Sequence, residues 1–221
     1  ARDQGIAPNE LIERIDRGKK KLFLAREARV RPGRDDKILT AWNGLMLTAF
    51  AEAASILGRE DYREVAVKNA EFILKNMMSG GRLLRTYRNG QANLNGYLED
   101  YAYVIEGLLA LYELTFDIRY YNQAIALSDT MFSQFWDDTD TGFFFTSKDH
   151  EYLITRTKDY FDNATPSGNS VAALALLKLW ILTEENKYRQ HAMAILRTMH
   201  QSMARYPSAF GYLLCALDAY L

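Results

Sequence analysis

The chain has 221 residues, of which 48% are hydrophobic and 25% are charged, and its formal net charge is −1. This composition is typical of a globular protein, and the near-neutral charge provides no overall field for binding nucleic acid or an anionic membrane. The single cysteine, Cys215, excludes an internal disulfide, and no apolar run approaches the length of a membrane span, so we expect a cytoplasmic protein.

Helices dominate the hydrophobic periodicity of the chain. The first is predicted to run from the favourable N-cap residue Asn9 to about residue 28, before the helix breaker Pro32-Gly33. Asp35 or Asp36 is predicted to start the second helix. That helix is apolar on almost every side and must therefore be buried on most sides.

The same arrangement then recurs, with an apolar helix, a short turn and an amphipathic helix that has one polar face. Tyr62, Tyr120 and Tyr188 each open the second helix of a pair, and we expect them to pack in the core, as aromatic residues at helical spacing usually do. A third apolar helix is predicted to be capped by Thr165 and to begin at Pro166. The remaining predicted helices span 62–77, 97–114, 120–136, 188–204 and 208–221.

Two excursions with strand character separate the helical pairs. Residues 81–90 are predicted to form a β-hairpin that turns at Asn89-Gly90. Residues 142–157, which include Tyr152 and Leu153, are predicted to form another. This order of elements predicts an all-α fold, a partial α/α toroid of antiparallel helical hairpins with short β-hairpin excursions.

An antiparallel arrangement of the pairs would give every inner helix the same direction, so that all their N-termini open at one end. Residues 34–43, 97–101 and 159–169 are then expected to face one depression. Helix N-termini carry free amides and a partial positive charge, which hold carboxylates in place or receive an anionic or hydroxylated ligand.

Four blocks of sequence carry a family resemblance, at residues 31–45, 98–102, 111–115 and 159–170. They resemble the signature of the spermatogenesis-associated, thioredoxin-like family (domain of unknown function 255). The resemblance implies an N-terminal thioredoxin-like domain followed by a six-hairpin toroid similar to that of N-acylglucosamine 2-epimerases and six-hairpin glycosidases. It further implies that residues 1–221 are a single domain, an internal fragment of that toroid from which the thioredoxin-like domain is missing.

Each of three predicted helix starts brings two carboxylates together, which capping alone does not require. One carboxylate of each pair is a candidate catalytic residue, because glycoside hydrolysis uses two carboxyl groups about 5–9.5 Å apart. These candidates are Asp36, Asp100 and Asp162. The alternative for every pair is a helix cap or an ion-pair partner with no chemical role.

The candidate ligand-binding residues surround the same helix starts. Trp42 and Tyr101 have apolar faces on which sugars stack, although a tryptophan is more often buried in the core than exposed as a platform. The polar and charged candidates are Arg34, Asp35, Lys37, Asn43, Glu99, Asp159, Asn163, Ser167 and Asn169.

The histidines argue against sugar 2-epimerisation through imidazole bases. His191 and His200 are predicted on an outer helix, and His150 falls in a β excursion, so none is expected in the depression. The sequence contains no motif for zinc, ATP or a dinucleotide, and no metal ion or cofactor is predicted.

Two classes of function follow from these patterns. The leading hypothesis is a sugar-binding or carbohydrate-processing toroid whose carboxylates perform any acid or base chemistry. The alternative is a non-catalytic recognition or docking module that accompanies the thioredoxin-like domain, or a helical scaffold for a protein partner. The apolar edges of an incomplete ring would also allow a homodimer.

Overall fold

The computed structural model describes residues 5–151 and 154–221, and the chain divides into two compact units. The first unit ends at Asp36 and contains the long helix α1 (Pro8–Glu27). Pro8 occupies the first turn, where its missing N–H costs no hydrogen bond, so the helix begins before the predicted cap Asn9. No residue of α1 is buried.

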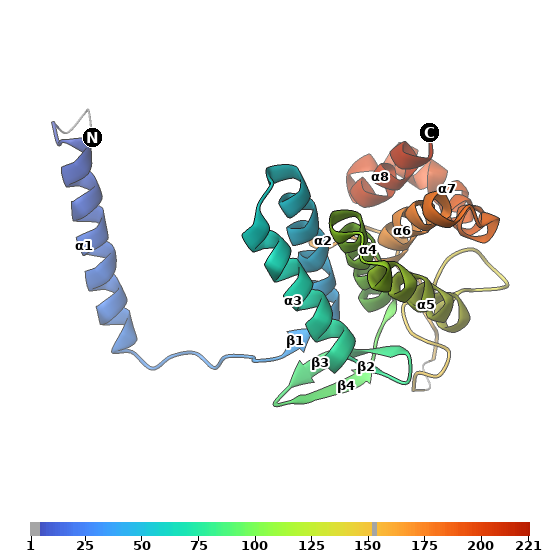
Figure 1. Ribbon diagram of the computed structural model, residues 1–221, viewed down its shortest axis with the longest axis horizontal. Helices are drawn as coiled ribbons and strands as arrows, with labels where there is room; N and C mark the ends of the chain where they lie inside the picture. Colours follow the sequence, from blue (N-terminus) through green and yellow to red (C-terminus); the bar gives the residue numbers. More distant parts are fainter. Residues whose placement is uncertain (1–4, 152–153) are drawn as a thin grey trace. The chain divides into compact units, whose positions relative to one another are not determined.

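The second unit, Lys37–Leu221, repeats a helical pair three times, as predicted (Figure 1). The pairs are α2 (Thr40–Leu57) with α3 (Glu60–Asn76), α4 (Leu98–Thr115) with α5 (Ile118–Phe135), and α6 (Gly168–Thr183) with α7 (Asn186–Arg205). A further helix, α8 (Gly211–Tyr220), follows a short 3-10 turn and begins at Gly211 rather than at the predicted residue 208.

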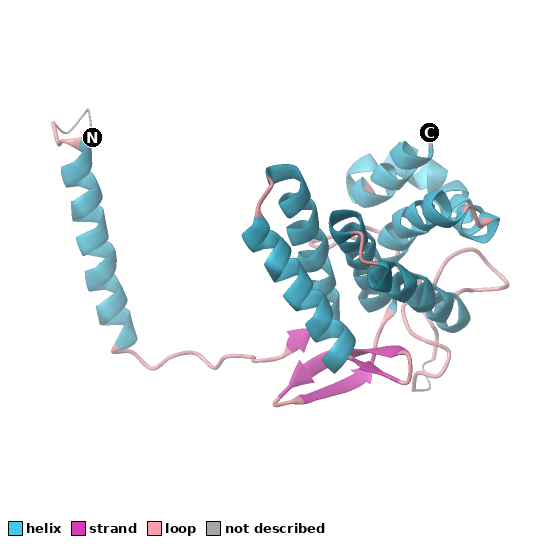
Figure 2. Cartoon of the chain, in the orientation of Figure 1, coloured by secondary structure: helices cyan, strands magenta, loops and turns pink. Residues whose placement is uncertain are grey.

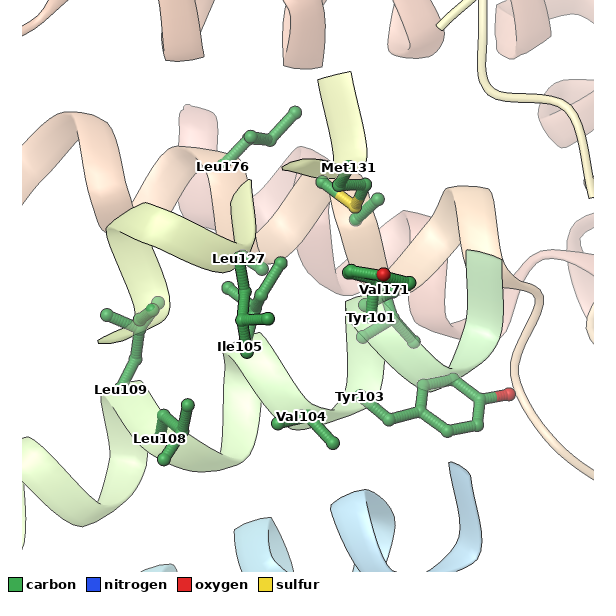
Figure 3. Packing of buried hydrophobic residues seen from close by; sticks show 14 of the residues in the cluster. Tyr101, Tyr103, Val104, Ile105, Leu108, Leu109, Leu127, Met131, Val171 and Leu176 are labelled. Carbon is green, nitrogen blue, oxygen red and sulfur yellow. The ribbon is translucent and has the colours of Figure 1, made fainter. Parts of the chain in front are cut away.

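Helix α4 is central to this unit and packs against α2, α5 and α6 (Figure 1). It is apolar on nearly all sides and is buried around most of its circumference, whereas the amphipathic helices α3, α5 and α7 bury one face. Figure 3 shows Ile105 and Leu109 of α4 and Leu127 and Met131 of α5 in one apolar layer. Helices α4 and α6 therefore form the inner side of the unit. The prediction that the second helix is buried on most sides is wrong, because α2 buries one face and exposes Trp42 and Ile56.

The three helical pairs turn in the same way. The inner helix of each pair ends at a residue with left-handed backbone dihedrals, namely Gly58 (φ 61°), Phe116 (φ 54°) and Glu184 (φ 59°). Each of these residues lies four positions before Tyr62, Tyr120 or Tyr188 in the sequence. Tyr120 and Tyr188 are fully buried, which confirms the expected packing role for these two tyrosines.

A small antiparallel sheet covers one end of the α2–α3 pair (Figure 2). Its strands are β1 (Ile38–Leu39), β2 (Met78–Ser79), β3 (Arg82–Arg88) and β4 (Gln91–Asn95). The predicted turn at Asn89-Gly90 is confirmed, and both of its residues have positive φ.

The second helix of the chain does not start at Asp35 or Asp36. Ile38 and Leu39 pair with Tyr87 and Thr86 of β3, and this pairing holds them in an extended conformation. The helix therefore begins at Thr40. The correction moves both aspartates out of the helix start and into the segment that precedes β1.

The predicted hairpin at 142–157 is wrong for the described part of that segment. Its Phe143 forms an isolated bridge with Trp136 at the end of α5, and the rest is an irregular loop whose amides bond to scattered carbonyls. Tyr152 and Leu153 lie outside the described residues. Phe143 is fully buried, so its side-chain packing holds this segment together with scattered backbone hydrogen bonds.

The third inner helix starts later than predicted. Ser167, not Thr165, is its N-cap, and the Ser167 hydroxyl accepts a hydrogen bond from the N–H of Ser170 at 3.0 Å. Pro166 lies outside the helix, and its carbonyl accepts a hydrogen bond from Tyr103.

Polar groups from α2, α4, α6 and α8 meet farther along α4. Glu106 exposes only 1% of its surface, and both of its carboxylate oxygens lie close to the Tyr212 hydroxyl of α8, at 2.6 and 2.7 Å. Lys178 of α6 lies 3.8 Å from Glu106 and 3.9 Å from Glu52 of α2. These contacts join elements that are far apart in the sequence.

Candidate functional site

Hydrogen bonds join the starts of the inner helices. The N–H of Ala41 in α2 donates to Asp100 in the first turn of α4 at 2.8 Å. Tyr103 of α4 donates to the Pro166 carbonyl just before α6, and Asp162 accepts hydrogen bonds from both α6 and α8. The structure thus brings residues near 41, 100 and 166 side by side, which is the arrangement expected of parallel inner helices.

Asp100 is a fully buried carboxylate at the centre of this region. It accepts the N–H of Ala41 on one oxygen and the N–H of Tyr97 on the other, each at 2.8 Å, and Arg85 lies 3.2 Å away. Burial raises the pKa of Asp100 to about 6, and the charge of Arg85 opposes this rise. Both oxygens therefore serve to fasten α2 and β3 to the start of α4.

Glu99 is the more accessible carboxylate of the same pair. Its side chain is 23% exposed, and Arg85 of β3 donates to it at 2.9 Å. The Arg85 guanidinium also lies 4.2 Å from the ring of Tyr97. Sequence reasoning missed Arg85, although a charged residue on the same side of β3 as the buried Leu83 was an available signal.

Asp162 caps two helices at once. One of its oxygens accepts the N–H of Ser167 at 2.8 Å and the other accepts the N–H of Tyr212 at 2.7 Å. Asp159 and Asn163 are exposed beside it, and Asp159 accepts the N–H of Phe161 at 3.1 Å. The loop before α6 is therefore held mainly by Asp162.

Asn169, a predicted ligand-binding residue, is buried and its amide is occupied within the fold. It accepts the N–H of Phe143 at 2.8 Å and donates to the carbonyls of Phe143 and Asp159 at 2.9 and 2.8 Å. Tyr101 is also fully buried, and its hydroxyl accepts the N–H of Leu83 at 3.1 Å. Both placements favour a packing role over ligand contact.

Tyr103 is a residue of this region that the sequence did not single out. Figure 3 shows its ring directed away from Leu108 and Leu127, and its hydroxyl donates to Pro166. Burial raises the pKa of Tyr103 to about 12, and the negative charges of Glu99, Asp162 and Asp100, in that order, add to the rise. Carboxylates from two helix starts therefore lie near the phenol of Tyr103. Glu99 and Tyr103 are four residues apart on one helix, so the sequence could have predicted that these two side chains are neighbours.

A separate cleft contains three of the predicted ligand-binding residues, Trp42, Asn43 and Lys37. They line a cleft of about 620 Å³ on the α2–α3 pair, and none of the candidate carboxylates lines it. Trp42 is 62% exposed, so the expectation that it belongs to the core is wrong. The reason is Gly44, whose Cα packs against the backbone of Tyr103, so that Trp42 points elsewhere on the helix.

Arg34, Asp35 and Asp36 belong to the first unit, where Arg34 forms an ion pair with Asp36. Their membership of the site remains a prediction.

No helix within the described ranges is both long and apolar enough to cross a membrane.

The expectation that every histidine is remote from the helix starts needs correction. His191 lies on α7 and packs 4.4 Å from the ring of Trp136, and His200 also lies on α7, as predicted. The ring of His150 instead lies 5.5 Å from that of Tyr97, the N-cap residue of α4. The sequence could not predict the contact between His150 and Tyr97, because this contact depends on the conformation of an irregular loop.

Comparison with known proteins gives homologues over most of the chain. Human spermatogenesis-associated protein 20 is 35% identical over 216 residues, which are 93% of this chain and 28% of that protein. The rat protein of the same name is 38% identical over 93% of this chain and 27% of its own length. The chain thus spans somewhat more than a quarter of these relatives. No family model matches it.

Solved structures with a similar fold are α/α toroids. A family 76 α-mannanase from Bacteroides thetaiotaomicron superposes with a TM-score of 0.66 at 18% identity, over 86% of this chain and 53% of that chain. A cellobiose 2-epimerase from Spirochaeta thermophila superposes with a TM-score of 0.61 at 13% identity, over 74% and 43%. The predicted all-α, six-hairpin toroid class is confirmed.

Proposed function

Because this chain is a homologue of spermatogenesis-associated protein 20 with the toroid fold of carbohydrate-processing enzymes, we propose that it binds a saccharide at the start of α4. The observation that supports this proposal is the group formed by Glu99, Arg85 and Tyr97. It combines a partly exposed carboxylate, a guanidinium and an aromatic ring. Carboxylates and guanidinium groups bind sugar hydroxyls, and an aromatic face binds the apolar side of a sugar ring.

Glu99 is the carboxylate best suited to contact the ligand. Asp100 and Asp162 each accept backbone N–H groups on both oxygens, and Asp100 is fully buried, so both side chains are engaged in holding the fold. We therefore assign ligand contact to Glu99, and assign to Asp100 and Asp162 the task of holding the helix starts in register. General acid or base chemistry at this site would then involve Glu99.

A thermal-shift screen of the protein with mannose, mannobiose and cellobiose tests the proposal. We expect at least one sugar to raise the melting temperature of the wild type. The Glu99→Gln variant should bind that sugar about tenfold more weakly, because a neutral amide replaces the charged hydrogen-bond acceptor. The matched control is Glu64→Gln, which makes the same change at an exposed ion pair on α3 and should bind as the wild type does.

A docking module for a thioredoxin-like domain is the second candidate. It is favoured by Arg85, which forms ion pairs with both Glu99 and Asp100 and so competes with a ligand for them. Hydrogen exchange on the full-length relative and on this segment alone distinguishes the two. Docking requires slower exchange around residues 97–101 in the longer protein, whereas saccharide binding alone leaves their exchange unchanged until sugar is added.

A further inference from the structure

Helix α8 is an apolar helix that is covered on one side only. It contains a single charged residue, Asp218, yet only Leu213 and Ala216 are buried, and it packs mainly against α6. The inner helices α2, α4 and α6 are each covered by the amphipathic second helix of their pair, α3, α5 or α7, which we call the outer helices. Among the described residues no outer helix packs closely against α8.

A groove between α7 and α8 marks the uncovered side. It has a volume of about 400 Å³, and its lining is mostly apolar, with side chains from both helices such as Leu196, Leu214 and Leu217. Two basic residues of α7, Arg197 and His200, line it as well. An amphipathic helix binds by placing its apolar face in a groove of this kind, so the lining suits a further outer helix.

Successive outer helices meet in a fixed register. The residue before the first tyrosine of α5, Arg119, has a guanidinium nitrogen 3.3 Å from a carboxylate oxygen of Glu71 on α3. The matching residue of α7, Lys187, has its amine 3.2 Å from a carboxylate oxygen of Asp129 on α5. Glu71 and Asp129 each lie nine positions after the first tyrosine of their own helix. The start of each outer helix therefore places a basic residue beside an acidic residue of the previous one.

The same position on α7 carries the opposite charge. The residue nine positions after Tyr188 is Arg197, which lines the groove. No carboxylate among the described residues forms an ion pair with Arg197. A helix that continued the series would therefore need an acidic residue where α5 has Arg119 and α7 has Lys187.

We propose that the groove between α7 and α8 is covered by a fourth outer helix from the longer protein, whose first turn carries an acidic residue that pairs with Arg197. The fold class supports this occupant, because a six-hairpin toroid has six helical pairs and the second unit contains three pairs and α8. The relatives have the necessary length, since the chain spans 28% of the human protein. The inference is independent of the saccharide site proposed at Glu99.

Helix α3 provides a probe of the required chemistry, because Asp61 precedes its first tyrosine, Tyr62. A synthetic peptide of residues 58–77 and its Asp61→Lys version are titrated to millimolar concentration against the protein, and the methyl NMR signals of Met193 and Leu217 are the readout. The wild type should bind the unmodified peptide about threefold more tightly than the Asp61→Lys peptide. The Arg197→Glu variant should reverse this order.

The control variant makes the same substitution away from the groove. Arg88→Glu, at an exposed residue of β3, should keep the wild-type order of the two peptides. Absence of methyl shifts with both peptides shows that the groove takes no helix and overturns the proposal. Equal affinity of the wild type for the two peptides contradicts the pairing with Arg197.

Two further measurements identify the source of the helix. Sedimentation velocity should give a monomer of this chain, and a dimer that the Leu217→Glu variant dissociates would assign the groove to a second copy and overturn the proposal. Hydrogen exchange of the α8 amides should be slower in the full-length relative than in this segment alone. Equal exchange in the two proteins shows that the rest of the longer protein leaves α8 uncovered, which also overturns the proposal.

Discussion

The N–H of Ala41 donates to a carboxylate oxygen of Asp100 at 2.8 Å, across 59 positions of sequence. This contact ties the first turn of α2 to the first turn of α4. Because the other oxygen of Asp100 accepts the N–H of Tyr97, one buried side chain satisfies amides from two helix starts. The arrangement makes Asp100 a structural residue of the site.

The Asp100→Asn variant should lose about 2–4 kcal/mol of unfolding free energy. An amide has only one acceptor atom, so one of the two buried N–H donors loses its partner, and Arg85 keeps only Glu99 as a counter-charge. Urea denaturation measures the loss. Asp129→Asn, at an exposed ion pair on α5, is the control and should stay within about 0.5 kcal/mol of the wild type, and equal stability of the two variants would contradict the assignment.

The stability of the wild type should depend on pH through the same residue. Burial raises the pKa of Asp100 from 3.8 to about 6, so the folded state binds this proton more tightly than the unfolded state. The contribution of Asp100 to stability is therefore largest below its unfolded pKa and falls as pH rises through about 6. The unfolding free energy of the wild type minus that of Asp100→Asn should decrease between about pH 4 and pH 7.5, and an increase over this range would show that Arg85 outweighs burial.

The Gly44→Ala variant should be destabilised by about 1–3 kcal/mol. A Cβ at this position would lie 2.8 Å from the carbonyl carbon of Tyr103, so α2 and α4 would have to move apart. Gly211→Ala, in α8, is the matched control, because a Cβ there meets no atom within 4 Å. Thermal unfolding of both variants measures the difference, and equal melting temperatures would contradict the close approach of the two helices.

The Glu184→Gly variant should be more stable than the wild type by about 1 kcal/mol. Glu184 ends α6 with φ of 59°, a conformation in which a side chain is strained and glycine is not. Gly58 already occupies the equivalent position after α2. Glu184→Ala also removes the carboxylate but keeps the strain, so it should not gain stability, and a similar gain in both variants would point to charge rather than to backbone conformation.

The sequence predicted the features that depend on local pattern. The repeated pairs follow from apolar and amphipathic periodicity, and the turn at Asn89-Gly90 follows from the conformational preferences of those two residues. The start of α2 was wrong because Ile38 and Leu39 pair with β3, and a two-residue strand is too short to leave a pattern.

The sequence predicted that the helix starts converge, and the site that we place there is still a prediction. The roles of the residues at these helix starts depend on contacts between distant segments. Arg85, Tyr103 and His150 enter through the β3 strand, the face of α4 and an irregular loop, and no spacing within one element predicts them. Trp42 left the core because the neighbouring Gly44, and not the tryptophan, meets α4.

Asp162 has a consequence for how the fold opens. Its two oxygens accept hydrogen bonds from the starts of both α6 and α8. Fraying of either helix therefore loosens Asp162, which is also the hydrogen-bond acceptor for the other helix. The amides of Ser167 and Tyr212 should then exchange with solvent as a single cooperative unit despite their separation along the chain. One carboxylate thereby sets a common threshold for local unfolding of two helices.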